Sequence, residues 1–374
     1  MIKTLKIRLL PTSEQEEQFR KHIGCSRYIW NWALAKQEEN YKNGEKYISA
    51  FSMIKLIPAL KNENPWLKEV SSSSLQTVVR DQEKAYKEFF KGTRKHPKFK
   101  KRKTAIKAYP VRCDRTYFID NAVDIEKVGK VKYQTNYNVP QGRGCKFTNP
   151  RIKLQSKKWI LTVGIECENQ AVELTDEAMG IDLGVKDLAI VAYGNLKLRY
   201  KNINKTKRIK NLERRKMRLQ RVISRKYRTN GNWEKTKNIE KLETQLRKVH
   251  ERIANIRHNY LHQTTHELTS LLPKEVIMED LNVSGMMKNK HLSKAIGEQN
   301  FAEFIRQMQY KCEWLGIKFT QVDRFYPSSK MCSCCGEIKK DLKLSDRTYI
   351  CPNCGAVIDR DYNAALNLMR YSVA

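Results

Sequence analysis

Three acidic residues lie in or beside apolar segments or at the start of a helix, where a carboxylate could take part in chemistry. Asp182 interrupts an apolar segment, Glu279 directly follows the apolar run 276–278, and Asp361 precedes the expected last helix. Burial removes the hydration of a carboxylate, so each acid needs a cationic partner. Taken singly, each is typical of a helix cap or a solvated strand end. Three converging carboxylates are instead suited to two Mg²⁺ ions, one activating water and one stabilising the leaving oxygen in phosphodiester hydrolysis.

Four of the ten cysteines have the spacing of a metal site. Fifteen residues separate the pairs Cys332-x2-Cys335 and Cys351-x2-Cys354. Four thiolates at this spacing form two knuckles and close a tetrahedral Zn²⁺ site that keeps no open position for catalysis. A glycine follows the second cysteine of each pair, where the turn needs a permissive backbone. We therefore expect one structural zinc ion, which replaces the core that so small a module lacks, and Cys334 is expected to be a bystander.

The overall charge points to nucleic acid as the partner. The 374 residues include 73 Lys+Arg and 40 Asp+Glu, a net charge of +33, and 40% are hydrophobic, which excludes a disordered basic tail. Such an excess opposes compaction unless a polyanion shares the space. A membrane surface is the competing partner, but no stretch approaches the roughly 18 apolar residues of a span, and the first residues lack the apolar core of a signal peptide. Clustered CxxC pairs also favour a reducing cytosol.

The first half of the chain reads as helices inserted into a β-module. Alternating apolar and basic residues predict a strand over 3–9, and either Thr12 with Gln15 or Ser13 with Glu16 offers a capping box for the following helix. Helical patterning continues to about residue 90. The run 91–107 then holds nine Lys/Arg and no acid, which indicates either a solvated face or a nucleic-acid groove. Short strands follow over 108–174, with a hairpin at 151–155 and 158–163 that the first strand could join.

The second half predicts a mixed α/β domain. Residues 179–193 read as two buried strands, and residues 199–228 carry fourteen Lys/Arg and one Glu in a helical context. An apolar stripe over 239–260 at 3-4 spacing predicts a second helix that packs on the first as a hairpin, so the stripe is core. A strand at 275–278, a helix at 301–315, a strand at 317–322 and a last helix from about 362 complete the domain, with the cysteine module inserted before the end.

The chain resembles TnpB, the family of insertion-sequence-encoded RNA-guided DNA endonucleases related to the type V CRISPR effectors. The resemblance is carried by sequence blocks that run through most of the chain. These blocks are Arg8-Leu9-Leu10-Pro11-Thr12, Phe89-Phe90-Lys91-Gly92, His96-Pro97-Lys98-Phe99-Lys100, Gly180-Ile181-Asp182-Leu183-Gly184-Val185, Glu279-Asp280-Leu281, Arg324-Phe325-Tyr326-Pro327-Ser328-Ser329-Lys330, the CxxC pairs and Asp359-Arg360-Asp361-Tyr362-Asn363-Ala364-Ala365. The last three blocks together are highly specific.

The resemblance implies an α+β multidomain fold. A wedge β-barrel would comprise residues 1–12 and 106–174, with a helical recognition domain at 13–105. An RNase H-like (RuvC) α/β nuclease domain would comprise residues 175–331 and 355–374. A zinc ribbon at 332–354 would be inserted into it as a target-nucleic-acid module.

The family's catalytic acids carry over onto Asp182, Glu279 and Asp361, which would hold the Mg²⁺ ions. Asp361 is preferred over Asp359 because the family's acid immediately precedes the x-Asn-Ala-Ala segment. Arg347 matches an arginine that assists near the scissile phosphate in relatives, although it is equally compatible with a solvated loop. No member of the triad is missing, so an active nuclease is expected.

The implied function is RNA-guided cleavage of double-stranded DNA in a prokaryotic cytoplasm, where the protein would associate with the nucleoid. The guide would be a transposon-derived RNA with one protein per RNA, the DNA would carry a short adjacent motif, and a transposase encoded nearby is a further expected partner. The segments 91–107 and 199–228 would contact phosphates. Two alternatives are an RNA-guided binding protein that does not cut and a transposon accessory DNA-binding protein that holds no RNA.

Overall fold

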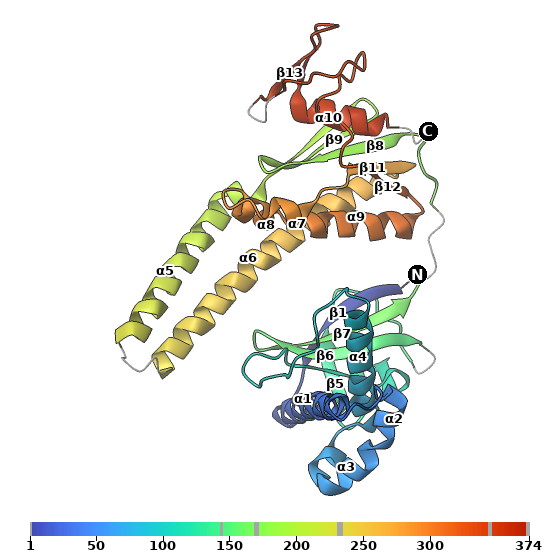
Figure 1. Ribbon diagram of the computed structural model, residues 1–374, viewed down its shortest axis with the longest axis vertical. Helices are drawn as coiled ribbons and strands as arrows, with labels where there is room; N and C mark the ends of the chain where they lie inside the picture. The colour runs from blue at the N-terminus through green and yellow to red at the C-terminus, as the bar shows by residue number, and fades with distance from the viewer. Residues whose placement is uncertain (1, 143–144, 168–171, 230–234, 343–345, 372–374) are drawn as a thin grey trace. The chain divides into compact units, whose positions relative to one another are not determined.

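The computed structural model describes residues 2–142, 145–167, 172–229, 235–342 and 346–371. It divides the chain into two compact units, Met1–Glu168 and Asn169–Ala374 (Figure 1). No helix within these described ranges is both long enough and apolar enough to cross a membrane.

The first unit contains the expected helices. They are α1 (Ser13–Lys42), α2 (Ala50–Lys55), α3 (Ile57–Glu63) and α4 (Ser72–Phe90), with a 3-10 turn at Pro65–Glu69. Of the two capping boxes that the sequence offers, the structure has the first: the Gln15 amide donates to Thr12 Oγ1 at 3.3 Å, and the Thr12 amide donates to Gln15 Oε1 at 3.1 Å. Two otherwise unpaired N–H groups at the helix start are thereby satisfied.

An antiparallel sheet of seven strands forms the rest of this unit. Its strands are β1 (Ile2–Leu10), β2 (Ala108–Pro110), β3 (Thr116–Ile119), β4 (Ala122–Ile125), β5 (Gly129–Gln134), β6 (Phe147–Gln155) and β7 (Lys158–Glu166). Their order is β2-β6-β7-β1-β5-β4-β3, so the first strand lies inside the sheet and the helices are inserted between it and its partners, as predicted. Ser156 and Lys157 turn the predicted β6–β7 hairpin with φ of 46° and 69°, as a type I′ turn requires. No pairing joins β2 to β3 in the described part of this unit, so closure into a barrel stays a prediction.

Helix α1 serves two cores in the first unit. Phe19 packs with Ile7, Leu161 and other side chains on the inner face of the sheet. About three turns further on, Ile29 belongs to a separate core formed with α2, α3 and α4, which includes Leu75. The 30-residue helix thus connects the sheet to the helical part.

The second unit is built on a mixed sheet of five strands. These strands are β8 (Ala178–Leu183), β9 (Asp187–Tyr193), β10 (Leu196–Lys201), β11 (Glu275–Glu279) and β12 (Lys318–Val322). Their order is β10-β9-β8-β11-β12; β8, β11 and β12 are parallel, and β9 is antiparallel to its neighbours β10 and β8. Residues 199–201 therefore belong to β10 rather than to the helical segment that the sequence predicted.

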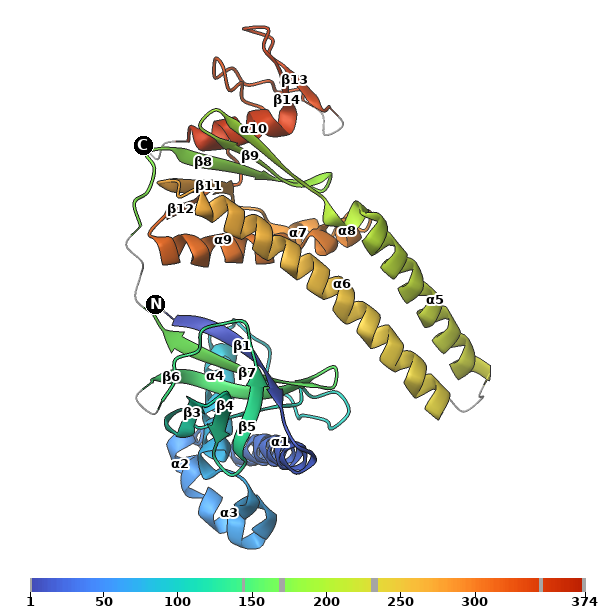
Figure 2. The same cartoon turned by 180° about the vertical axis from the view of Figure 1, so that it is seen from behind.

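Helices cover both faces of this sheet, as Figures 1 and 2 both show. On one face lies α10 (Arg360–Met369), where Ala365 contacts Ile190 and Ala192 of β9. On the other face lie α6 (Lys237–Ser270) and α9 (Phe301–Leu315), whose apolar side chains pack with Val191 and other residues of the sheet. Every residue of β9 is buried because both faces are covered. Two short helices, α7 (Val283–Met286) and α8 (Ser293–Gln299), were not predicted.

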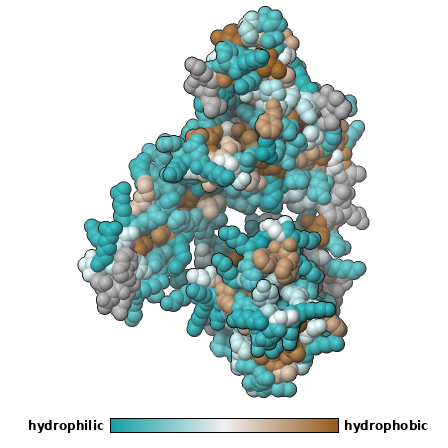
Figure 3. Space-filling view, viewed as in Figure 1, coloured by the Kyte–Doolittle hydropathy of each residue, from teal (hydrophilic) through white to brown (hydrophobic). Residues whose placement is uncertain are grey.

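The predicted basic hairpin is present. Helix α5 (Lys207–Thr229) packs along α6 through Leu219, Val249 and Ile253, so the apolar stripe is core as expected. Basic side chains occupy the other face of α5, where Arg214, Arg218, Arg221 and Arg225 line a shallow groove. Figure 3 shows mainly hydrophilic side chains over this hairpin. The arrangement presents a basic helical face to solvent.

Candidate active site and metal centre

The three predicted acids come from three elements of the second unit. Asp182 is the penultimate residue of β8 and Glu279 is the last residue of β11. These two strands are parallel, with Met278 opposite Ile181, so their carboxyl ends place Glu279 beside Asp182 at the same sheet edge. Asp361 lies in the first turn of α10, the helix that packs against β9 on one face of the sheet.

Close approach between α10 and β8 depends on Gly180. A Cβ built on Gly180 would overlap the Ala365 carbonyl oxygen and the Met369 amide nitrogen, and would lie 2.9 Å from Met369 Cα. Only a residue without a Cβ leaves room for the helix backbone here. Gly180 thus sets how closely the helix that bears Asp361 lies against the strand that bears Asp182.

The charges of Glu279 and Asp361 act on Asp182. Burial, followed by the charges of Glu279 and Asp361, raises the pKa of Asp182 well above its usual range, and Arg360 partly opposes this shift. The structure therefore brings together the three acids that the sequence singled out. Among the described residues, the carboxylate oxygens of these three acids are not all within 4.8 Å of one another. Such a cluster of like charges favours cations.

Other side chains hold Glu279 in place. The Ser328 hydroxyl donates to Glu279 Oε1, and Ser328 is itself only 2% exposed. Asn367 of α10 donates to the Ser328 carbonyl oxygen at 2.7 Å. The sequence alone predicts no role for Ser328, because its contact with Glu279 joins residues 49 positions apart.

Two arginines face Asp361. Arg360 donates to Asp361 Oδ1 from Nε at 3.1 Å and from Nη2 at 3.0 Å. The predicted Arg347 lies with Nη1 3.8 Å from Asp361 Oδ2, and its side chain is 52% exposed. Asp359, the rejected alternative, caps α10 by accepting from the Tyr362 amide at 3.0 Å. Asp359 therefore acts as a helix cap, while Asp361 faces Arg360 and Arg347; the choice of Asp361 as the catalytic acid stays a prediction.

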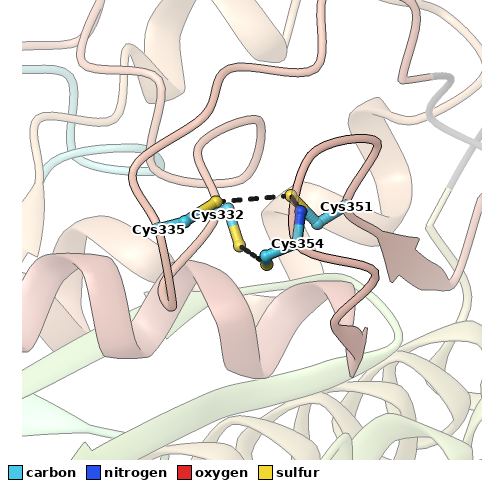
Figure 4. Close-up of side chains that lie close together, drawn as sticks. All are labelled: Cys332, Cys335, Cys351 and Cys354. Carbon is cyan, nitrogen blue, oxygen red and sulfur yellow. Dashed lines mark hydrogen bonds between the residues drawn. The ribbon is translucent and has the colours of Figure 1, made fainter.

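The four predicted metal cysteines also converge (Figure 4). Their sulfurs all lie within 4.8 Å of one another, with 3.7 Å between Cys332 and Cys354 and 3.5 Å between Cys335 and Cys351. Zn–S bonds of about 2.3 Å in a tetrahedron place sulfurs about 3.8 Å apart, so the four thiolates fit Zn²⁺. Cys334 is exposed and lies outside the cluster.

Backbone geometry forms the two knuckles that hold these cysteines. Gly336 and Gly355 have φ of 79° and 69°, a region that other residues rarely adopt. Backbone amides face the sulfurs: the Cys334 amide donates to Cys332 Sγ at 3.4 Å and the Cys354 amide donates to Cys351 Sγ at 3.5 Å. The short strands β13 (Thr348–Ile350) and β14 (Val357–Asp359) flank the second knuckle, and Tyr349 is the largest fully buried side chain in this small core.

Two buried asparagines dock the cysteine module onto α10. Asn363 accepts from the Ser333 amide at 2.9 Å and donates to the Met331 carbonyl oxygen at 2.6 Å. Asn367 donates to the same carbonyl at 2.6 Å. The module is therefore anchored on the helix that carries Asp361. These anchors were not predicted from the sequence, although Asn363 belongs to the block 359–365 that carries the resemblance.

Part of the first basic run has a structural role. Lys100 Nζ lies 3.5 Å from the centre of the Trp30 ring, and the Trp30 indole donates to the Lys98 carbonyl oxygen at 3.0 Å. Asn31 exchanges two further hydrogen bonds with the Lys100 backbone. Burial lowers the pKa of Lys100 to about 8. This stretch of the run is held against α1 and is not a fully solvated face.

Two curated relatives cover nearly the whole chain, and a third covers just over half of it. A protein from Escherichia coli (strain K12) named putative RNA-guided DNA endonuclease InsQ is 31% identical over 98% of this chain and 92% of its own length. A putative RNA-guided DNA endonuclease from Streptomyces pristinaespiralis is 28% identical over 100% of this chain and 90% of its own. The CRISPR-associated endodeoxyribonuclease Cas12f1 of Sulfoacidibacillus thermotolerans is 30% identical over 57% of this chain and 50% of its own.

Family models and a solved structure agree with these relatives. A probable transposase model matches residues 161–290, and a Cas12f1-like TNB domain model matches residues 301–368. A helix-turn-helix domain model matches residues 1–46, where the structure has β1 followed by the single long helix α1. The chain in a cryo-EM structure of a Cas12f1–sgRNA–target DNA complex has the same fold, with a TM-score of 0.65, 15% identity and 99% coverage of both chains.

Proposed function

Because the chain belongs to the TnpB family of RNA-guided DNA endonucleases, we propose that it cuts double-stranded DNA at Asp182, Glu279 and Asp361 under the direction of a bound RNA. The observation that carries this proposal is the convergence of the three acids at one edge of the five-stranded sheet. The guide would be a transposon-derived RNA, and the target would carry a short motif beside the paired sequence.

The three carboxylates supply the donor set that two Mg²⁺ ions prefer. Bound there, the ions would supply an activated water and stabilise the leaving oxygen of the cut phosphodiester. Burial, followed by the charges of Glu279 and Asp361, raises the pKa of Asp182, so positive charge among the three acids is favourable. Ser328 would fix the orientation of Glu279 through its hydroxyl hydrogen bond.

Arg347 would act on the DNA rather than on the acids. Its guanidinium is half exposed yet within 3.8 Å of Asp361, so it can reach a phosphate held at the triad. A guanidinium matches phosphate oxygens in a bidentate geometry and stabilises charge that develops there. The basic groove on α5 is a suitable surface for RNA or DNA phosphates.

A cleavage assay with the purified ribonucleoprotein tests the proposal. The substrate is a plasmid that matches the bound RNA, and Mg²⁺ is the added ion. We expect Asp182→Ala, Glu279→Gln and Asp361→Ala to abolish cutting while the bound RNA is retained, because each variant removes a metal ligand but leaves the basic surfaces intact. Robust cleavage by Asp182→Ala would refute the assignment.

Glu275→Gln is the matched control for Glu279→Gln. Glu275 lies at the opposite end of the same strand, where Lys318 and Thr320 pair with it. The control should keep cleavage within about twofold, because glutamine has the size of glutamate and the change lies at the end of the strand away from the site. An RNA-bound protein that never cuts would favour the binding-only alternative, and a protein that purifies without RNA would favour the accessory DNA-binding alternative.

A further inference from the structure

A second cluster of metal-ligand side chains lies in the second unit, on the face of the sheet opposite α10. His258 and His262 are four residues apart on α6, which places both imidazoles on the same side of the helix. Glu303 reaches them from the first turn of α9. One ligand atom from each of the three lies within 4.8 Å of the others. No role in the proposed nuclease reaction accounts for them.

Distances in this cluster match those around a bound transition-metal ion. The two Nε2 atoms are 3.3 Å apart, and His258 Nε2 lies 3.9 Å from Glu303 Oε1. Metal–nitrogen bonds of about 2.0–2.1 Å at a tetrahedral angle require nitrogens about 3.3–3.4 Å apart. The imidazoles are thus already at the required separation, and Glu303 Oε1 would have to approach His258 Nε2 by about half an ångström.

Neighbouring side chains fix the orientation of the carboxylate. Arg306 donates to both oxygens of Glu303, at 2.8 and 2.7 Å, and the buried Gln307 donates to Oε1 at 2.9 Å. The Thr265 hydroxyl of α6 in turn donates to Gln307 at 3.0 Å. Such outer hydrogen bonds are typical of ligands in metal sites because they hold the donor atom in place.

Two cations and one anion lie at the cluster. Arg306 and Lys311 of α9 are the cations that oppose an incoming ion, and Glu303 is the anion that offsets one of them.

We propose that His258, His262 and Glu303 bind a divalent transition-metal ion, Zn²⁺ being the occupant that this donor set favours, and that the ion joins α6 to α9. Two imidazoles and one carboxylate are a donor set for Zn²⁺ and similar ions, whereas Mg²⁺ prefers oxygen ligands alone. Since α6 is also one arm of the basic hairpin, the ion would fasten the base of that hairpin to the sheet.

Zinc content measures the proposal without any cleavage assay. The tag-free full chain, purified with its RNA, is saturated with ZnCl₂, freed of unbound metal by gel filtration and analysed by mass spectrometry. We expect His258→Ala and His262→Ala each to hold one ion fewer per chain than the unmodified protein, with at least a tenfold loss of affinity in zinc titration. His258 is 47% exposed, so its replacement should leave the fold intact.

His250→Ala is the matched control, because His250 is an exposed histidine two turns earlier on α6 and outside the cluster. It should retain the full zinc content. Equal zinc content in the unmodified protein and His258→Ala would overturn the proposal. The two histidines would then be a hydrogen-bonded pair that binds no metal. An equal loss in His250→Ala would show nonspecific binding to surface histidines and would overturn it too. If the protein binds this zinc ion but never cuts DNA, the proposed nuclease function is refuted and the proposed zinc site is not.

Discussion

Gly180→Ala tests the link between helix packing and the acid cluster most directly. The added methyl group would overlap the backbone of α10 at Ala365 and Met369. Met369 Cα alone, at 2.9 Å, would have to withdraw by about 0.6 Å to reach an ordinary carbon–carbon separation of about 3.5 Å. The closer carbonyl oxygen requires a larger shift. Backbone cannot rotate away as a side chain can, so we expect a loss near the upper end of the overpacking range, about 3 kcal/mol of unfolding free energy.

The cleavage rate of Gly180→Ala should fall by more than its loss of unfolding free energy explains. Asp361 lies one turn before Ala365 on the displaced helix, and a misplacement of about 1 Å in a reacting group costs about 100-fold in rate. The measurements are urea unfolding of the full chain and plasmid cleavage by the ribonucleoprotein at a temperature where the variant remains folded. Binding of RNA should persist, because the basic face of α5 is not touched.

Gly297→Ala on α8 is the matched control for this prediction. A Cβ there meets only the flexible end of Met287, with Cε at 3.3 Å. The same chemical change should therefore leave unfolding and cleavage nearly unchanged. If Gly180→Ala unfolds and cuts as the unmodified protein does, the close approach of α10 to β8 does not position the triad and the reasoning is wrong.

Three further outcomes are expected. Burial lowers the Lys100 pKa to about 8, so the folded protein favours the neutral amine and its unfolding free energy should rise between pH 8 and pH 10. Lys100→Met should abolish this rise, which urea unfolding at each pH measures. Cys351→Ser should remove one zinc ion per chain. Because the cysteine module has little core of its own, Tyr349 should also lose its protection from hydrogen exchange, while the amides of β8 and β9 stay protected. Arg347→Ala should slow cleavage about 100-fold with RNA binding unchanged, and unchanged cleavage would contradict a contact with the phosphate.

Local sequence patterns predicted the elements of this fold well where their side chains alternate or repeat clearly. The hairpin of β6 and β7 and the apolar stripe of α6 follow from such periodicity. Strand β10 was missed because its outward lysine and arginine residues merge with the basic run that follows, although Leu196, Leu198 and Tyr200 alternate with them. Its pairing with β9 depends on the tertiary fold.

The acids and cysteines were found because each violates or repeats a local rule. Asp182 interrupts an apolar strand, and the CxxC pairs have a fixed spacing. Ser328 and Asn363 gave no such signal, because their importance arises only when distant segments meet at Glu279 and at the start of the cysteine module. The pair His258 and His262 had visible helical spacing, but its third member comes from another helix.

The central position of β1 has a consequence for synthesis on the ribosome. Its hydrogen-bonding partners are residues 132–134 and 159–166, so its two edges stay unpaired until those residues have emerged. At about 5–20 residues per second this delay lasts roughly 8 to 30 s. Meanwhile α1 to α4 can already form their own core. Lys6 and Arg8 point to solvent between the apolar residues of β1, and such charges on an unpaired strand discourage pairing with neighbouring nascent chains until its own partners arrive.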